Sequence, residues 1–107
     1  MIYELRTYHV MPGRMPDITK RFNDVTMDLF KKHGMQVVGF WQTAVGESDE
    51  LIYMMAFEDM NDMTRKWGAF QADAEWQEAR AKSEVNGPLV ARMTNRILRP
   101  TSFSPLK

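Results

Sequence analysis

The sequence of 107 residues contains no cysteine. This absence excludes disulfides, thiolate chemistry and cysteine-bound metals, and it suits a reducing compartment, so we expect a cytoplasmic protein. The first residues follow a strand pattern instead of a basic and apolar leader, and no apolar run approaches the roughly 20 residues of a membrane span. We therefore expect neither a signal peptide nor a membrane segment.

An excess of basic residues is also missing, because Lys+Arg and Asp+Glu both number 14 and the formal net charge is zero. Broad electrostatic capture of nucleic acid needs a basic surplus, so no nucleic-acid partner is expected. The six glycines are isolated from one another and form no phosphate-binding loop. The two histidines, His9 and His33, lack the spacing of a metal motif. We expect no metal and no cofactor.

The spacing of hydrophobic residues predicts an alternating order of strands and helices. The predicted elements are a strand over 2–10, a helix over 15–33, strands over 35–45 and 51–58, a helical segment over 60–85 that bends near Asp73, and a strand over 89–99. The order β-α-β-β-α-β is that of a ferredoxin-like α+β domain with a four-stranded antiparallel sheet. We expect one domain over residues 1–107, ending in an irregular tail.

Right-handed crossovers place both predicted helices on the same face of the sheet. The other face would expose aromatic and aliphatic residues, and exposed apolar surface of that extent usually marks an interface. We therefore expect a homodimer in which two sheets pack face to face. The tail over 100–107 is expected to pack on the partner or on the end of the resulting barrel, with Phe103 and Leu106 as anchors.

Five short patterns occur in order along the chain. They are Tyr3-Glu4-Leu5-Arg6-Thr7-Tyr8, Pro12-Gly13, Gly39-Phe40-Trp41, the spacing Trp67…Phe70…Asp73…Trp76, and Leu98-Arg99-Pro100-Thr101…Phe103-Ser104-Pro105-Leu106. Together they resemble the NIPSNAP family of the dimeric α/β-barrel superfamily. The resemblance implies a ferredoxin-like dimer. That superfamily includes cofactor-free monooxygenases, isomerases, haem-degrading enzymes and proteins without known catalysis, so fold alone selects no function.

The resemblance speaks against one of these activities. Haem-degrading relatives use an arrangement of Asn, Trp and His, and Trp67 could represent the Trp. The second helical segment contains no histidine, however, so haem degradation is disfavoured.

The first strand is central in a ferredoxin-like sheet, and it places Glu4, Arg6 and Tyr8 on one face. We predict that this face is the one without helices, and that Arg92, Thr94 and Arg96 of the last strand lie beside it. A shift of one residue in the last strand would replace Arg92 and Arg96 with Asn95 and Arg99.

Two interpretations of these charged residues remain open. In the first, Arg6, Arg92 or Arg96 binds the carboxylate of a small acid, while Glu4 or Tyr8 handles a proton. His9 is a further candidate base and Trp67 a candidate lining residue. In the second, the charges form an ion-pair network that fixes register.

The sequence therefore predicts a dimeric protein that binds a small apolar or aromatic acid. The alternative is a cofactor-independent monooxygenase or isomerase that acts on such a ligand. Nothing in the sequence decides whether the chain is an enzyme.

Overall fold

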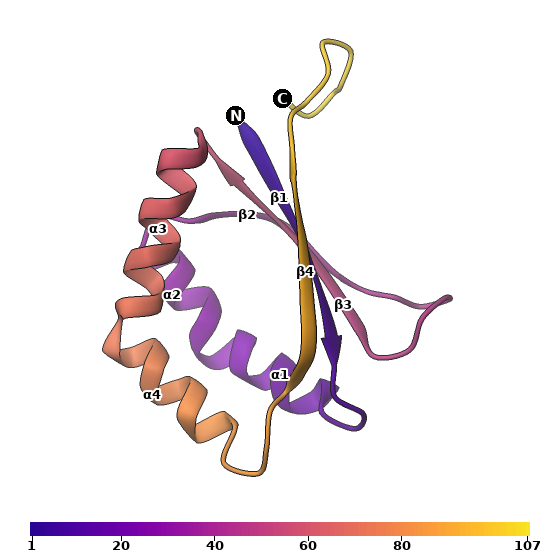
Figure 1. Ribbon diagram of the computed structural model, residues 1–107, viewed down its shortest axis with the longest axis vertical. Helices are drawn as coiled ribbons and strands as arrows, with labels where there is room; N and C mark the ends of the chain where they lie inside the picture. The colour runs from indigo at the N-terminus through magenta and orange to yellow at the C-terminus, as the bar shows by residue number, and fades with distance from the viewer.

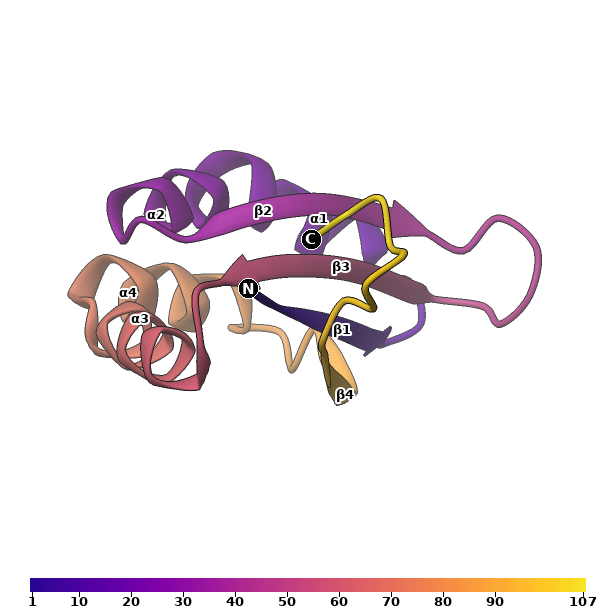
Figure 2. The same cartoon turned by 90° about the horizontal axis from the view of Figure 1, so that it is seen from above.

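The computed structural model describes the whole chain, Met1–Lys107, and has the predicted α+β order. The strands are β1 (Ile2–Val10), β2 (Gln36–Gln42), β3 (Glu50–Phe57) and β4 (Val90–Leu98); the helices are α1 (Met15–Arg21), η1 (Phe22–Thr26), α2 (Met27–Lys32), α3 (Met60–Ala72) and α4 (Ala74–Ser83). The strands form one antiparallel sheet in the order β2-β3-β1-β4. Figures 1 and 2 show all the helices on one side of this sheet.

The first helical segment covers the predicted range but is not a uniform α-helix. A π-helical stretch, η1, separates α1 from α2, and within it the Thr26 hydroxyl donates to the Arg21 carbonyl at 3.3 Å. The helix stops, as predicted, just before a left-handed Gly34, whose φ is +67°. The amide of Gly34 donates to the Lys31 carbonyl and the amide of Met35 donates to the Phe30 carbonyl, the paired bonds of a Schellman motif.

The second helical segment is divided at the predicted position. Asp59 caps α3, because its carboxylate accepts from the amide of Asp62 at 2.8 Å. Asp73 has extended backbone angles, and its carboxylate accepts from the amide of Glu75 at 2.9 Å. This second cap begins α4 in a new direction, as Figure 1 shows. No helix is both long enough and apolar enough to cross a membrane.

The core lies between the helices and the inner face of the sheet, the face that the helices cover. Its buried side chains include Ile18, Phe22, Leu29, Phe30, Leu51, Tyr53, Met55, Phe57 and Phe70. The opposite face, called the outer face below, has no helix over it (Figure 2). The C-terminal tail projects beyond the end of β4 in Figure 1, and the Phe103 residue is 86% exposed.

A bulge in β2 breaks the strict alternation that the sequence predicted there. The register with β3 shifts between Val37 and Gly39. Val37 and Phe40 consequently both pack against the core, while Trp41 is exposed. The Trp41 ring lies over Gly39, since a Cβ at residue 39 would be 2.8 Å from Trp41 Cη2.

Candidate functional site

Glu4, Arg6 and Tyr8 of β1 lie on the inner face, which corrects the prediction that they face away from the helices. Glu4 is only 1% exposed and is hydrogen-bonded to Trp67 of α3. The β3 residues paired with Glu4, Arg6 and Tyr8 are Met55, Tyr53 and Leu51, which all belong to the core. The prediction assumed that charged groups avoid such a face. Here the Glu4 carboxylate tolerates burial because it accepts several hydrogen bonds.

The Glu4 carboxylate is the centre of this inner cluster, which we define as Glu4, Arg6, Tyr8, Tyr53, Trp67 and Asn95. Its Oε1 accepts from the Trp67 indole at 2.6 Å. Its Oε2 accepts from Arg6 Nη1 at 3.0 Å and from Asn95 Nδ2 at 2.9 Å. The donors come from a helix, from the same strand and from the edge strand β4, so Glu4 ties these three elements together.

Arg6 is a largely buried cation surrounded by aromatic rings. Its guanidinium carbon lies 4.3 Å from the centre of the Trp67 ring and under 6 Å from those of Tyr8 and Tyr53. Burial acts to lower the pKa of Arg6, but Tyr53, Tyr8 and the Glu4 carboxylate raise it above its usual value. Arg6 Nε is buried and has no hydrogen-bond partner. The guanidinium thus has donor capacity that Glu4 does not use.

Two tyrosine hydroxyls complete the cluster. The hydroxyls of Tyr8 and Tyr53 are 2.9 Å apart, and their rings meet edge to face at 5.3 Å. Burial, with Tyr8 as the next contributor, raises the pKa of Tyr53 well above its usual value, so this phenol stays protonated at neutral pH. Phe40 stacks on Tyr53 with 4.6 Å between ring centres. The cluster therefore has a neutral aromatic wall.

The structure separates the arginines that the sequence grouped together. In the register of β1 with β4, Arg96 pairs with Leu5 and Arg92 pairs with His9, so both arginines lie on the outer face. Asn95 pairs with Arg6 and faces the helices. The alternative register considered from the sequence therefore holds for Asn95, while Arg92 and Arg96 cannot share a pocket with Arg6.

The remaining candidates are dispersed. Trp67 joins Arg6 and Glu4 as a lining residue. His9 lies on the outer face, with its Nδ1 3.6 Å from a carboxylate oxygen of Glu47. His33 bonds Asp73 at 2.7 Å and so joins α2 to the break between α3 and α4. Tyr53 was not among the predicted site residues, although its alternation with Leu51 and Met55 could have placed it on the inner face.

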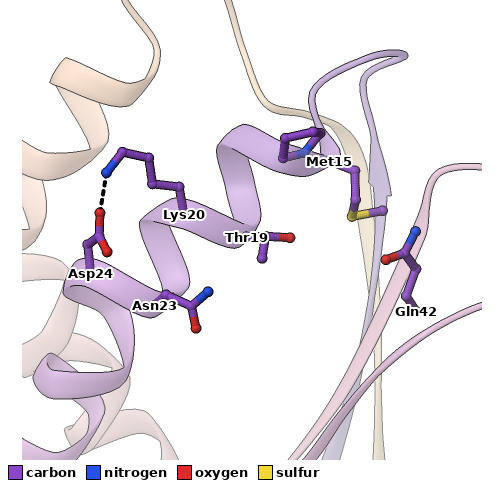
Figure 3. Close-up of a pocket in the computed structure, with 7 residues that line it drawn as sticks. Met15, Thr19, Lys20, Asn23, Asp24 and Gln42 are labelled. Carbon is purple, nitrogen blue, oxygen red and sulfur yellow. Dashed lines mark hydrogen bonds and ion pairs between the residues drawn. The ribbon is translucent and has the colours of Figure 1, made fainter.

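Three surface hollows lie near the first helical segment, and two of them also reach strands of the sheet. Figure 3 shows one of them, lined by Met15, Thr19, Lys20, Asn23, Asp24 and Gln42 together with Pro16. Lys20 and Asp24 pair with each other there. The second hollow, of about 220 Å³, is mainly apolar and is lined by Thr19, Phe22, Asn23, Met27, Phe40 and Leu51. Phe22 and Phe40 also contact Tyr53, so the second hollow borders the aromatic wall.

The sheet order, the antiparallel pairing and the helices on one face define a ferredoxin-like α+β protein. The sequence profile named NIPSNAP matches residues 3–105. The chain belongs to the NIPSNAP family.

Relatives support this assignment without giving an activity. The chain is 26% identical over 106 residues to Protein NipSnap homolog 2 of Danio rerio, covering 99% of this chain but 35% of that protein, so it spans about a third of this longer relative. It is also similar to a NIPSNAP family protein of unknown function from Agrobacterium tumefaciens, with a TM-score of 0.88, 28% identity and coverage of 100% and 94% of the two chains.

A more distant likeness concerns the fold alone. A Nitrosomonas europaea protein, provisionally assigned as an antibiotic biosynthesis monooxygenase, has a TM-score of 0.65 at 10% identity, over 94% of this chain and 98% of that chain.

Proposed function

We propose that the chain binds a small aromatic or apolar carboxylic acid at the inner cluster. The observation that carries this proposal is Arg6, a largely buried cation whose Nε has no partner, surrounded by the rings of Trp67, Tyr8 and Tyr53. An arginine presents several donors in one plane and pairs well with a carboxylate, while aromatic rings favour a flat apolar body. This combination of one cation and several rings selects an acid over a neutral or basic ligand.

The β4 side of the cluster provides the approach. Asn95 is exposed, and its neighbours on the same face, Met93 and Ile97, are 40% and 38% exposed. The Arg6 side chain is 12% exposed. A ligand that arrives over β4 would meet Asn95 first and place its carboxylate against Arg6, while Glu4 holds the other end of the guanidinium in place.

Binding is tested by calorimetric titration of the full-length chain with benzoate and, for comparison, with benzamide. We expect benzoate to bind and benzamide not to bind, because only benzoate offers a charge to Arg6. Arg6→Lys keeps the charge but loses the planar pair of donors, and should weaken the binding of benzoate at least about tenfold. Arg80→Lys, at a side chain on α4 that is 59% exposed, is the matched control. Equal affinity for the two compounds, or equal loss in the two variants, would contradict the proposal.

A second candidate is cofactor-independent oxygenation or isomerisation of such an acid. The adjacent hydroxyls of Tyr8 and Tyr53 favour it, since they can relay a proton beside the proposed carboxylate position. The fold shared with the Nitrosomonas protein supports the same direction. Oxygen uptake with a dihydroxybenzoate is the assay, and Tyr8→Phe should reduce the rate at least about a hundredfold without abolishing binding. A rate unchanged by Tyr8→Phe would remove this candidate.

We also propose that two copies pair through the outer face. Its register places Leu5, Ile52 and Met54 side by side, flanked by Trp41, which is 52% exposed, and Leu98, which is 37% exposed. No helix covers these side chains, and a second copy would remove them from water.

Light scattering on a chromatographic peak should give about twice the chain mass of 12.5 kDa. Trp41→Glu should give the single mass, whereas Met60→Glu, at an exposed site on α3, should not. The tail anchors Phe103 and Leu106 are proposed to lie on the second copy, so hydrogen exchange in the tail should be slower in the dimer than in the Trp41→Glu monomer. A wild-type monomer would refute both statements.

A further inference from the structure

A second group of side chains with ligand chemistry lies at one end of the outer face. It consists of His9 at the end of β1, Glu47 in the loop between β2 and β3, and Glu50 at the start of β3. One ring nitrogen of His9 and one oxygen from each carboxylate all lie within 4.8 Å of one another. We propose that these three residues bind a divalent transition-metal cation such as Zn²⁺ or Mn²⁺.

The fold brings the three residues together from separate segments. His9 and Glu50 are direct partners in the register of β1 with β3, so their side chains share the outer face. The Val10 amide donates to the Asp49 carbonyl at 2.8 Å, which holds the end of the loop against β1. Glu47 lies in this loop and points its carboxylate back to His9, with 3.6 Å between Nδ1 and Oε1.

The spacing is close to what a metal requires. Two ligands of a tetrahedral Zn²⁺ lie about 3.4 Å apart when each is about 2.1 Å from the ion. The 3.6 Å between His9 and Glu47 is near this value. The other ligand atoms lie within 4.8 Å of one another, so no separation must shorten by more than about 1.4 Å to reach such metal distances. The Glu47 side chain is 58% exposed and is free to make that movement.

The chemistry of the donors selects the kind of ion. One imidazole with two carboxylates suits Zn²⁺, Mn²⁺ or Fe²⁺, and leaves coordination positions for water or a ligand. Glu50 is already oriented by a neighbour, because its Oε1 accepts from the Thr43 hydroxyl at 2.6 Å. Hydrogen bonds of this kind fix the direction of a metal-ligating carboxylate. Arg92 pairs with His9 from β4, on the side of β1 away from Glu50.

The test is a calorimetric titration of the full-length chain with Zn²⁺ and Mn²⁺, followed by the visible absorption of Co²⁺ as a reporter of coordination. We expect one ion per chain. Glu47→Gln should weaken binding of the ion at least about tenfold. The Glu47 side chain is exposed, so the fold should be retained, and circular dichroism checks this. Glu78→Gln on α4 is the matched control, since its side chain is 67% exposed and should leave affinity unchanged.

Substitution of the two histidines separates the proposed site from the other imidazole. His9→Gln should abolish the Co²⁺ spectrum, and His33→Gln should leave it intact. Absence of saturable binding up to millimolar metal, or equal affinity in the wild type and Glu47→Gln, would overturn the proposal. This group lies on the opposite face from Arg6, so neither the binding nor the absence of binding of a metal here tests the proposed acid-binding site.

Discussion

The pairing of buried Glu4 with largely buried Arg6 predicts that the two side chains affect stability in a strongly non-additive way. Removing one member of a buried ion pair strands the other charge in the core, which costs about 3–5 kcal/mol. Arg6→Met should therefore cost about that much, because Glu4 would keep only the neutral donors of Trp67 and Asn95. Glu4→Leu should cost a similar amount, because Arg6 would lose its carboxylate partner.

The double variant Glu4→Leu/Arg6→Met should be more stable than either single variant. Neither charge is then desolvated, and replacement of a buried pair by apolar residues is often neutral or stabilising by about 1–4 kcal/mol. The Trp67 indole loses its acceptor, which costs about 1–3 kcal/mol, whereas the exposed Asn95 can bond water. These effects nearly cancel, so the free energy of unfolding of the double variant should lie within about 2 kcal/mol of the wild-type value. This loss is much smaller than the sum of the two single losses.

Urea unfolding followed by far-ultraviolet circular dichroism measures all four free energies of unfolding at one fixed protein concentration. Arg80→Met is the matched control, because this side chain is 59% exposed on α4 and should change stability by at most about 0.5 kcal/mol. The dependence of the two charges on each other would be refuted if the loss in the double variant equalled the sum of the two single losses, or if each single loss were below about 1 kcal/mol.

Two further predictions concern other parts of the fold. Hydrogen bonds from Lys32 and His33 hold the pKa of Asp73 at about 2, below its usual 3.8. The ionised Asp73 carboxylate therefore stabilises the fold fully above about pH 4, and this stabilisation is lost as the pH falls towards 2. Asp73→Asn should flatten the decrease in melting temperature over that range, and an unchanged decrease would contradict this. Gly39→Ala adds a methyl group that would lie 2.8 Å from the Trp41 ring and should displace that ring. The fluorescence emission of Trp41 should change, while stability should fall by less than about 1 kcal/mol. Unchanged emission would be inconsistent with that contact.

Local patterns predicted the order of elements well because their signals act over a few residues. The caps at Asp59 and Asp73 and the left-handed Gly34 all mark helix ends through hydrogen bonds to adjacent backbone. These signals, with alternation along β1, are sufficient for a ferredoxin-like order. The bulge between Val37 and Gly39 had no comparable signal, because it depends on register with β3.

The facing of β1 could not be read in the same way. Both faces of this strand carry apolar residues, so alternation alone does not decide which one meets the helices, and choosing the wrong one exchanges every side chain. The deciding contact joins Glu4 to Trp67, 63 residues away, and its second partner Asn95 comes from the end of the chain. The sequence identified Arg6 and Trp67 as candidates, but their proximity depends on tertiary packing.

Because β4 contributes to both faces, we expect assembly and ligand binding to influence each other. This edge strand directs Asn95 towards Glu4 on the inner face and Arg96 outwards onto the face proposed to pair. A second copy that holds β4 in place would keep Asn95 on Glu4, and a hydrogen bond to a charged group contributes about 1.5–3 kcal/mol. Benzoate affinity should consequently be about tenfold lower in the Trp41→Glu monomer than in the wild-type dimer. When Asn95→Ala is also present, the dimer and the Trp41→Glu monomer should bind benzoate with equal affinity. Equal affinity of the wild-type dimer and the Trp41→Glu monomer would show that β4 transmits nothing between the two faces.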